Sequence, residues 1–307
     1  MRLPPFVRPG VPLAGFTTFG IGGPAGWLAE PATRGELREA LALAGELGVE
    51  ARVIGGGSNL LIADSGFPGL VVRLSPRGEF GSRERLPGPS RRWRVGAAAA
   101  LSGLVDHLAG LGVAGLEFLA GVPGSVGGAA RMNAGGGGRG FGRFVVEAEV
   151  FPFAGGELVL SGDDLSFSYR QSRLAGGVAV ALILRFLESA SPEAVLAGMR
   201  ESRARKRESQ PLDLPSAGCV FRNPPGESAG ALLEEAGCKG WREGGAEVSD
   251  RHANFIVNRG GASAREVALL AGRMRRAVAK ARGVWLELEV ILWGDDPVFP
   301  ELTERNP

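Results

Sequence analysis

The stretch Val53-Ile54-Gly55-Gly56-Gly57-Ser58-Asn59-Leu60-Leu61 decides how the first part of this chain folds. Two apolar residues with strand character run directly into three consecutive glycines. Glycines leave the backbone N–H groups uncovered, and a concave run of such donors suits a pyrophosphate. Serine and asparagine side chains can add further donors. The stretch therefore predicts a strand that ends in a phosphate-binding turn, formed by Gly55, Gly56, Gly57, Ser58, Asn59 and Leu60.

A second glycine-rich stretch, residues 120–128, leads into the sequence Met132-Asn133-Ala134-Gly135. It is too rich in glycine for an ordinary helix and too long for a simple hairpin. Either stretch alone also fits an ordinary loop, since the chain has 50 glycines. Taken as a pair, the two stretches suit the pyrophosphate of a dinucleotide. The second would contribute Gly121, Val122, Pro123, Gly124, Ser125, Gly127, Gly128, Asn133 and Ala134.

Composition narrows the class of protein. The 307 residues suffice for about two or three domains. A net charge of +2 gives no case for nucleic-acid binding. No signal peptide is visible, and no uncharged apolar segment reaches the roughly 18 residues of a membrane span. Two cysteines and two histidines, without clustering, predict reduced thiols in a cytoplasmic protein and no metal site. We expect no membrane partner, and we expect a monomer.

Local signals predict mixed helices and strands. Capping boxes at Thr33/Glu36 and Ser263/Glu266 predict two helices, the first ending near Gly48. Ser102 is expected to cap another helix, and a further helix is expected to start at residues 191–193, with proline in its first turn. Strands are predicted at residues 53–54, 70–74, 145–151, 178–186, 254–258 and 286–290.

A ten-residue segment in the last third, residues 215–224, carries a single thiol. In Pro215-Ser216-Ala217-Gly218-Cys219-Val220-Phe221-Arg222-Asn223-Pro224, the glycine before Cys219 permits a close backbone approach. The apolar residues after the thiol are expected to begin a strand that holds it, and Asn-Pro ends the run. By itself this segment predicts only a buried cysteine.

Several motifs in order resemble the UDP-N-acetylenolpyruvoylglucosamine reductase family. The resemblance spans about residues 13–294, and the chain is similar to the shorter subtype of the family, which lacks a tyrosine-bearing lid. It implies an α+β fold, with a two-part FAD-binding region of the vanillyl-alcohol-oxidase type and a smaller α+β substrate-binding domain. The implied domains are 1–75 and 76–190, the latter joined by a C-terminal strand at 284–297, and 191–283. The motifs are residues 16–25, both glycine-rich stretches, Ser168-Tyr169-Arg170-Gln171-Ser172, residues 210–212, the cysteine turn, residues 247–253 and Glu289-Val290.

The resemblance also implies a reaction. FAD, held without a covalent bond, takes hydride from NADPH and passes it to C3 of the enolpyruvyl group of UDP-N-acetylglucosamine enolpyruvate. The product is UDP-N-acetylmuramate, a peptidoglycan precursor. Cys219 matches the proton donor for C2, Arg170 the arginine that binds the carboxylate, and Glu289 the catalytic glutamate. Taken alone, these three would be a core thiol, a surface arginine and the outer face of an edge strand.

The chain departs from the family pattern at three single residues and in the tract at residues 135–140, which is richer in glycine than the family's. Cys219 stands where serine is usual, Arg222 where lysine is common, and Gly20 where arginine is usual. A thiol, with a reference pKa of about 8.5, is chemically able to protonate carbon. Tyr169, beside Arg170, is a candidate for contact with either flavin or substrate. Arg222 and Asn223 flank the proton donor and are candidates for the diphosphate of the substrate. His252 fits either the substrate phosphate or a local turn cap, and the cap is favoured.

Two other functions stay open at this point. The first is another FAD-dependent sugar or alcohol oxidase of the same fold, which often tethers flavin through histidine. Neither His107 nor His252 lies in a glycine-rich segment, which disfavours a tether. The second is a sugar-nucleotide binding protein without catalysis, which would have no need for a thiol, an arginine and a glutamate together.

Overall fold

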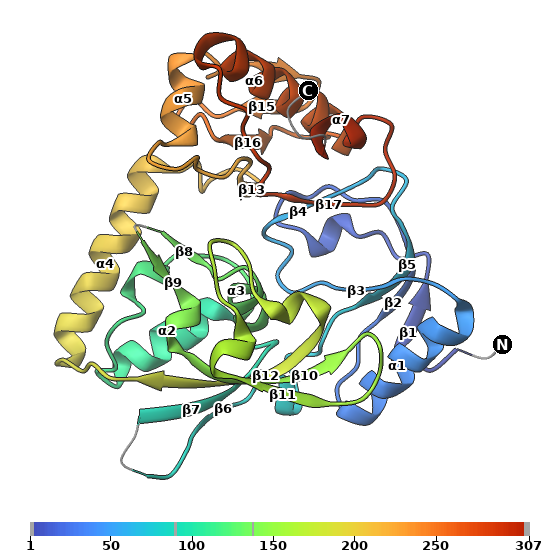
Figure 1. Ribbon diagram of the computed structural model, residues 1–307, viewed down its shortest axis with the longest axis vertical. Helices are drawn as coiled ribbons and strands as arrows, with labels where there is room; N and C mark the ends of the chain where they lie inside the picture. Colours follow the sequence, from blue (N-terminus) through green and yellow to red (C-terminus); the bar gives the residue numbers. More distant parts are fainter. Residues whose placement is uncertain (1–2, 89–90, 137, 304–307) are drawn as a thin grey trace. The chain divides into compact units, whose positions relative to one another are not determined.

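The computed structural model describes residues 3–88, 91–136 and 138–303, and it divides into two compact units. Unit 1 comprises Met1–Arg8, Leu28–Gly56 and Gly69–Arg205, and unit 2 comprises Pro9–Trp27, Gly57–Pro68 and Lys206–Pro307. Helices and sheets occur in both units, which confirms the α+β class (Figure 1). The division into three domains implied by the resemblance stays a prediction.

The N-terminal sheet has the strand order β1-β2-β5-β3. Helix α1 (Arg34–Leu47) connects β2 to β3, which lies parallel to β5. The predicted cap is present, because the Thr33 hydroxyl accepts from Glu36 N–H, but the Glu36 carboxylate accepts from Ala32 N–H. The helix ends at Gly48 in the left-handed conformation, as predicted. The strands are β1 (Val7–Pro9), β2 (Ala25–Ala29), β3 (Ala51–Val53) and β5 (Phe67–Val72).

An antiparallel sheet of order β11-β10-β12-β7-β6 lies in unit 1, and α3 (Val126–Arg131) packs against it (Figure 1). Helix α2 (Leu101–Gly110) buries Leu104, Val105 and Leu108 beside it. This helix begins one residue before Ser102, so the predicted serine cap is wrong, and Ala100 occupies the N-cap. The strands are β6 (Arg83–Arg85), β7 (Arg91–Gly96), β10 (Val145–Pro152), β11 (Leu158–Ser161) and β12 (Gly177–Phe186).

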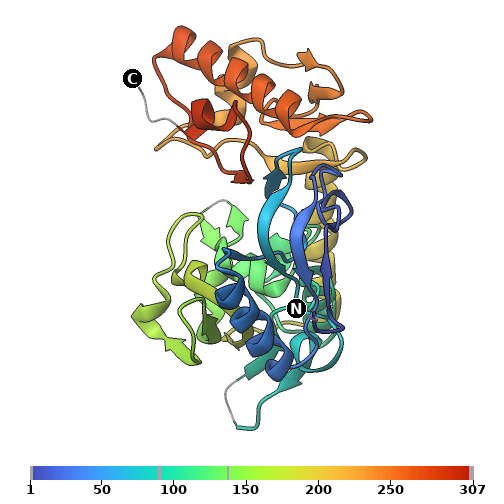
Figure 2. The same cartoon turned by 90° about the vertical axis from the view of Figure 1, so that its right-hand side faces the viewer.

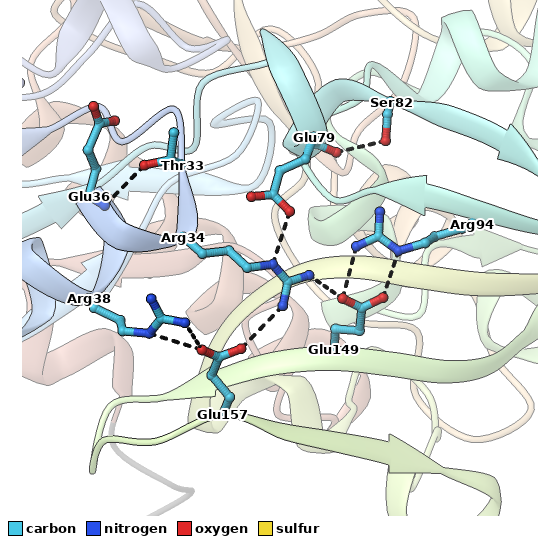
Figure 3. Close-up of polar contacts among 9 residues, drawn as sticks. All are labelled: Thr33, Arg34, Glu36, Arg38, Glu79, Ser82, Arg94, Glu149 and Glu157. Carbon is cyan, nitrogen blue, oxygen red and sulfur yellow. Dashed lines mark hydrogen bonds and ion pairs between the residues drawn. The ribbon is translucent and has the colours of Figure 1, made fainter.

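An ion-pair network joins α1 to this antiparallel sheet (Figure 3). Arg34 on α1 contacts Glu79 at 2.9 Å, Glu157 at 3.2 Å, and Glu149 on β10. Arg94 on β7 donates two hydrogen bonds, of 2.8 and 2.9 Å, to the Glu149 carboxylate. These hydrogen bonds, from Arg94 first and then from Arg34, lower the pKa of Glu149. The network therefore holds segments that are distant in sequence through one ionised carboxylate.

Unit 2 is built on the antiparallel sheet β13-β16-β15-β14, and α6 packs against β14 and β15 (Figures 1 and 2). Helix α6 (Ala264–Arg282) starts with the complete predicted capping box of Ser263 and Glu266, and its apolar face is buried in the core of the unit. The sheet consists of β13 (Ser216–Cys219), β14 (Arg242–Glu243), β15 (Ala246–Val248) and β16 (Phe255–Asn258).

The remaining elements are short or connecting. Helix α4 (Pro192–Ser209) starts at the predicted proline and carries residues of both units. None of the described helices is both long and apolar enough to cross a membrane. The others are α5 (Ala229–Glu235), α7 (Phe299–Thr303), β4 (Leu60–Ile62), β17 (Ile291–Trp293), β8 (Gly135–Gly136), β9 (Arg139–Gly140) and the 3-10 turns Ala14–Phe16, Gly78–Gly81, Glu117–Leu119, Phe141–Phe144, Gly162–Leu165 and Arg173–Gly176.

Two strand predictions near the candidate catalytic residues are wrong. The strand at Cys219 precedes the thiol instead of following it. Residues 286–290 form no regular strand: Leu288 makes a single bridge to Phe221, and the strand β17 begins only at Ile291. Strand β17 pairs in parallel with β4, and not with a strand from residues 76–190.

Candidate functional site

Two glycines of the first stretch, Gly55 and Gly56, lie directly against the second stretch in unit 1. A Cβ atom on Gly56 would lie 2.5 Å from the Cα of Gly124, and one on Gly55 would lie 2.4 Å from the Ser125 hydroxyl oxygen. Such distances exclude any side chain unless the backbone moves. The first two glycines are therefore required by a close backbone approach, which brings together stretches separated by about 70 residues of sequence.

The first stretch has the donors that a pyrophosphate requires. Within the described ranges, the backbone N–H groups of Gly55, Gly56 and Gly57 make no hydrogen bond to the protein. Gly57 has φ of +60°, and a Cβ there would lie 2.0 Å from the Phe16 carbonyl oxygen, so it must be glycine. Three successive uncovered donors in a cradle that a Cβ would fill fit an anionic cofactor.

The second stretch uses several of its donors internally. The N–H groups of Val126 and Gly127 donate to the carbonyls of Ala99 and Ala97, and Gly128 N–H donates to the Ser125 hydroxyl at the start of α3. These groups therefore position the turn. Val122 N–H likewise donates to the Leu119 carbonyl, and Pro123 has no N–H to donate. Cofactor contacts by the members of this stretch stay predictions, namely Gly121, Val122, Pro123, Gly124, Ser125, Gly127 and Gly128.

Two predicted cofactor residues are asparagines whose side chains hold backbone in place. The Asn59 amide donates to the carbonyl of Glu289 at 3.0 Å. The Asn133 amide accepts from Gly142 N–H at 2.8 Å and donates to the Ser168 carbonyl at 2.9 Å. Each asparagine thus fixes a segment that carries a candidate catalytic residue. Cofactor contacts by these two, and by Ser58, Leu60 and Ala134, stay predictions.

Arg170 lies at the tip of a tight turn in unit 1. Ser168 and Gln171 exchange backbone hydrogen bonds across this turn, and Arg170 has φ of +58°, which is uncommon for a residue with a side chain. Its guanidinium donates to the Gly135 carbonyl at 3.0 Å and lies 5.1 Å from the ring centre of Tyr169. The positive φ and these two contacts orient the guanidinium, as a carboxylate-binding arginine requires.

Cys219 lies in unit 2 at the end of β13, half-buried. Between Ser216 and Cys219 this strand has one residue more than its partner β16, so it bulges immediately before the thiol. Gly218 has φ of +77° in the bulge, and a Cβ there would meet no atom within 4 Å. Gly218 is therefore needed for its backbone conformation, and not for the close approach predicted from the sequence.

Glu289 is anchored to the residue that follows the thiol. Its backbone N–H donates to the Val220 carbonyl at 2.8 Å, and Arg222 N–H donates to the Glu287 carbonyl at 2.8 Å. Phe221 and Leu288 form an antiparallel bridge between these two hydrogen bonds. The structure thus brings together two of the three predicted catalytic residues, Cys219 and Glu289, on adjacent backbone segments.

Sequence reasoning missed one residue in this arrangement. Asn254 is 2% exposed, and its side-chain amide bonds both the N–H and the carbonyl of Phe221, at 2.9 and 2.8 Å. The only signal in the sequence was an amide next to the apolar run of residues 255–257, where a buried amide requires partners.

The predicted substrate residues of unit 2 have internal contacts. The guanidinium of Arg222 lies 3.7 Å from the carboxylate of Glu287, measured from Nη1 to Oε2. The Oδ1 of Asn223 accepts from Ala229 N–H at the start of α5. His252 accepts from Asn254 N–H and packs 4.9 Å from the Phe255 ring centre; burial lowers its pKa and keeps it neutral at pH 7. Substrate contacts by these three, and by Tyr169, stay predictions. For His252 the contacts support the local structural role.

The second thiol packs in the core. Cys238 is fully buried after α5, and burial raises its pKa to about 11. At neutral pH it is therefore an unreactive thiol.

Comparison with known proteins matches two family models. The model described as "FAD binding domain" matches residues 26–162, and the model described as "UDP-N-acetylenolpyruvoylglucosamine reductase, C-terminal domain" matches residues 210–293. These ranges contain both glycine-rich stretches, the cysteine turn and Glu289.

Full-length relatives agree with these matches. The chain is 44% identical to UDP-N-acetylenolpyruvoylglucosamine reductase 2 of Symbiobacterium thermophilum, over 98% of this chain and 96% of the relative. It is 42% identical to the Moorella thermoacetica reductase, over 92% of each. The crystal structure of the Thermus caldophilus reductase superimposes with a TM-score of 0.81 at 40% identity, covering 94% of this chain and all of the other.

Proposed function

Because the chain belongs to the UDP-N-acetylenolpyruvoylglucosamine reductase family and is an FAD-dependent oxidoreductase of peptidoglycan synthesis, we propose that it reduces UDP-N-acetylglucosamine enolpyruvate to UDP-N-acetylmuramate with NADPH. The observation that carries the proposal is the anchoring of Glu289 beside the cysteine turn, through its bond to the Val220 carbonyl. A sugar-nucleotide binding protein would have no use for this pairing. We further propose a cytoplasmic location.

The cofactor would be held by the first glycine-rich stretch. The uncovered N–H groups of Gly55, Gly56 and Gly57 fit its pyrophosphate. Bound FAD supplies the hydride that adds to C3 of the enolpyruvyl group, after that hydride has been taken from NADPH. With no histidine in either glycine-rich stretch, the proposed attachment is non-covalent.

Hydride addition at C3 leaves negative charge at C2 and on the neighbouring carboxylate, so the protein must supply a cation and a proton. Arg170 would bind the carboxylate with its planar guanidinium, whose direction is set by the Gly135 carbonyl. Glu289 would help to polarise the charged intermediate. The thiol of Cys219 would give its proton to C2, completing the addition of one hydride and one proton across the double bond.

The purified protein provides the test. We expect a yellow protein that loses its flavin absorbance when NADPH is added without air and regains it when the enolpyruvyl substrate follows. Mass spectrometry of the sugar nucleotide should show the gain of one hydride and one proton. Acid precipitation should release FAD into the supernatant. Hydrogen peroxide formation from a sugar or alcohol, without use of the enolpyruvyl substrate, would instead identify an oxidase.

A further inference from the structure

We propose that Asn254 is a positioning residue that sets the placement of the Cys219 thiol and the Glu289 carboxylate through the backbone of Val220 and Phe221. The inference rests on the proposed function for the roles of Cys219 and Glu289. The contacts that carry it are hydrogen bonds of unit 2.

Asn254 makes three bonds to two consecutive residues. Its side-chain Oδ1 accepts from Phe221 N–H at 2.9 Å, and its Nδ2 donates to the Phe221 carbonyl at 2.8 Å. Its own backbone carbonyl accepts from Val220 N–H at 2.9 Å. One buried residue therefore satisfies three of the four backbone polar groups that directly follow the thiol.

On the side that faces β16, regular strand pairing does not continue along this segment. Strand β13 ends at Cys219, after the bulge at residues 217–218, and Phe221 makes only an isolated bridge. The regular ladder therefore stops at the thiol. From that point, the side-chain amide of Asn254 replaces the ladder hydrogen bonds and keeps the chain in line beside residue 254.

The same segment is the template for Glu289. The remaining polar group, the Val220 carbonyl, accepts from Glu289 N–H at 2.8 Å. A displacement of Val220 and Phe221 would therefore move both proposed catalytic residues. Cys219 would move because a peptide bond joins it to Val220, and Glu289 would move because its N–H is hydrogen-bonded to the Val220 carbonyl. The backbone of Asn254 is itself held on both sides. Its N–H donates to His252 Nδ1 at 3.2 Å, and strand β16 begins at the next residue.

The test is the substitution Asn254→Asp, which keeps size and the Oδ1 acceptor. An aspartate removes the donor to the Phe221 carbonyl and turns a negative oxygen toward it. We expect flavin reduction by NADPH to proceed as in the wild type, because that half-reaction does not use Cys219 or Glu289. Reduction of the enolpyruvyl substrate should slow by about 10²-fold, the cost of a displacement of about 1 Å at a reacting group.

Asn258, at the other end of β16 from Asn254, provides a matched control. Its Oδ1 accepts from Gly260 and Ala262 N–H, and its Nδ2 donates to the Phe19 carbonyl, so it makes an equivalent clamp on other loops. Asn258→Asp should lower the melting temperature while leaving the second half-reaction near the wild-type rate. An equal loss in the second half-reaction for both variants would overturn the proposal, because the effect would then be general loosening.

A second measurement does not depend on the proposed reaction. Cys238 is buried with a pKa raised to about 11, so iodoacetamide should alkylate Cys219 selectively in the native protein. Asn254→Asp, and the smaller Asn254→Ser if the first variant fails to fold, should change the alkylation rate of Cys219 severalfold, and Asn258→Asp should not. Wild-type protein that alkylates as expected but cannot reduce the substrate would refute the proposed function alone. An unchanged alkylation rate in the Asn254 variants would refute the positioning role.

Discussion

Replacing Gly56 by alanine would force apart the two glycine-rich stretches that we propose hold FAD. The added Cβ would lie 2.5 Å from the Gly124 Cα, whereas ordinary van der Waals contact begins near 3.4 Å. The stretches must therefore separate by about 0.9 Å, the difference between these two distances. The backbone of Gly56 itself has no positive φ, so the effect comes from space alone.

The expected magnitude follows from where this strain can relax. Overpacking of a tight contact costs about 1–3 kcal/mol. In the apoprotein the two stretches can relax apart, but bound FAD holds them together and keeps the strain. The cost therefore falls on the holoprotein, and FAD affinity should decrease by about 5- to 150-fold, since each 1.4 kcal/mol is a factor of ten.

Flavin fluorescence measures this affinity in a titration of apoprotein with FAD. Gly45→Ala is the matched control, because Gly45 lies inside α1 with no atom within 4 Å of a Cβ. It should leave FAD affinity unchanged and stabilise unit 1 by about 0.5–1 kcal/mol. Gly56→Ala protein with wild-type FAD affinity would refute the assignment of this contact to the cofactor cradle.

Three further predictions concern chemistry and stability. Arg170→Ala and Glu289→Gln should abolish enolpyruvyl reduction while stopped-flow measurements still show flavin reduction by NADPH; loss of the first half-reaction in either would contradict its role. Cys219→Ala should stall at the same step and Cys219→Ser should remain active, with a turnover assay as the readout. Because the folded pKa of Glu149 is lowered, its stabilisation is full at pH 7 and is lost as pH falls below the ordinary value of 4.5. Glu149→Gln should thus lower the free energy of unfolding at pH 7 by about 2–3 kcal/mol. In acid, the difference in unfolding free energy between this variant and the wild type should shrink. An equal difference at both pH values would show that the carboxylate charge is not responsible.

Local sequence signals predicted the helices well. The caps at Thr33 and Ser263, and Gly48 at the end of α1, depend on residues within one helical turn of each other. Such short-range hydrogen bonds form in the same way whatever the rest of the fold does. At Ser102 the local signal was misleading. The helix starts at Leu101 with Ala100 as its N-cap, so Ser102 lies inside the helix and the predicted serine cap was wrong.

Motif order was enough to identify the family and its FAD domain, because the reacting residue types must recur in the same sequence context. Cys219, Arg170 and Glu289 were recognised in this way, without any knowledge of their surroundings. Their catalytic and binding roles stay predictions.

The tertiary structure alone decided how these residues are held. The contact of Gly56 with Gly124, the clamp of Asn254 on Phe221, and the attachment of Glu289 to Val220 each join segments between about 30 and 70 residues apart. A hydrogen bond between such segments leaves no periodicity in the sequence of either one. For the same reason, the alternation at residues 286–290 indicated a strand, whereas long-range partners determined a single bridge with backbone anchors on each side of it.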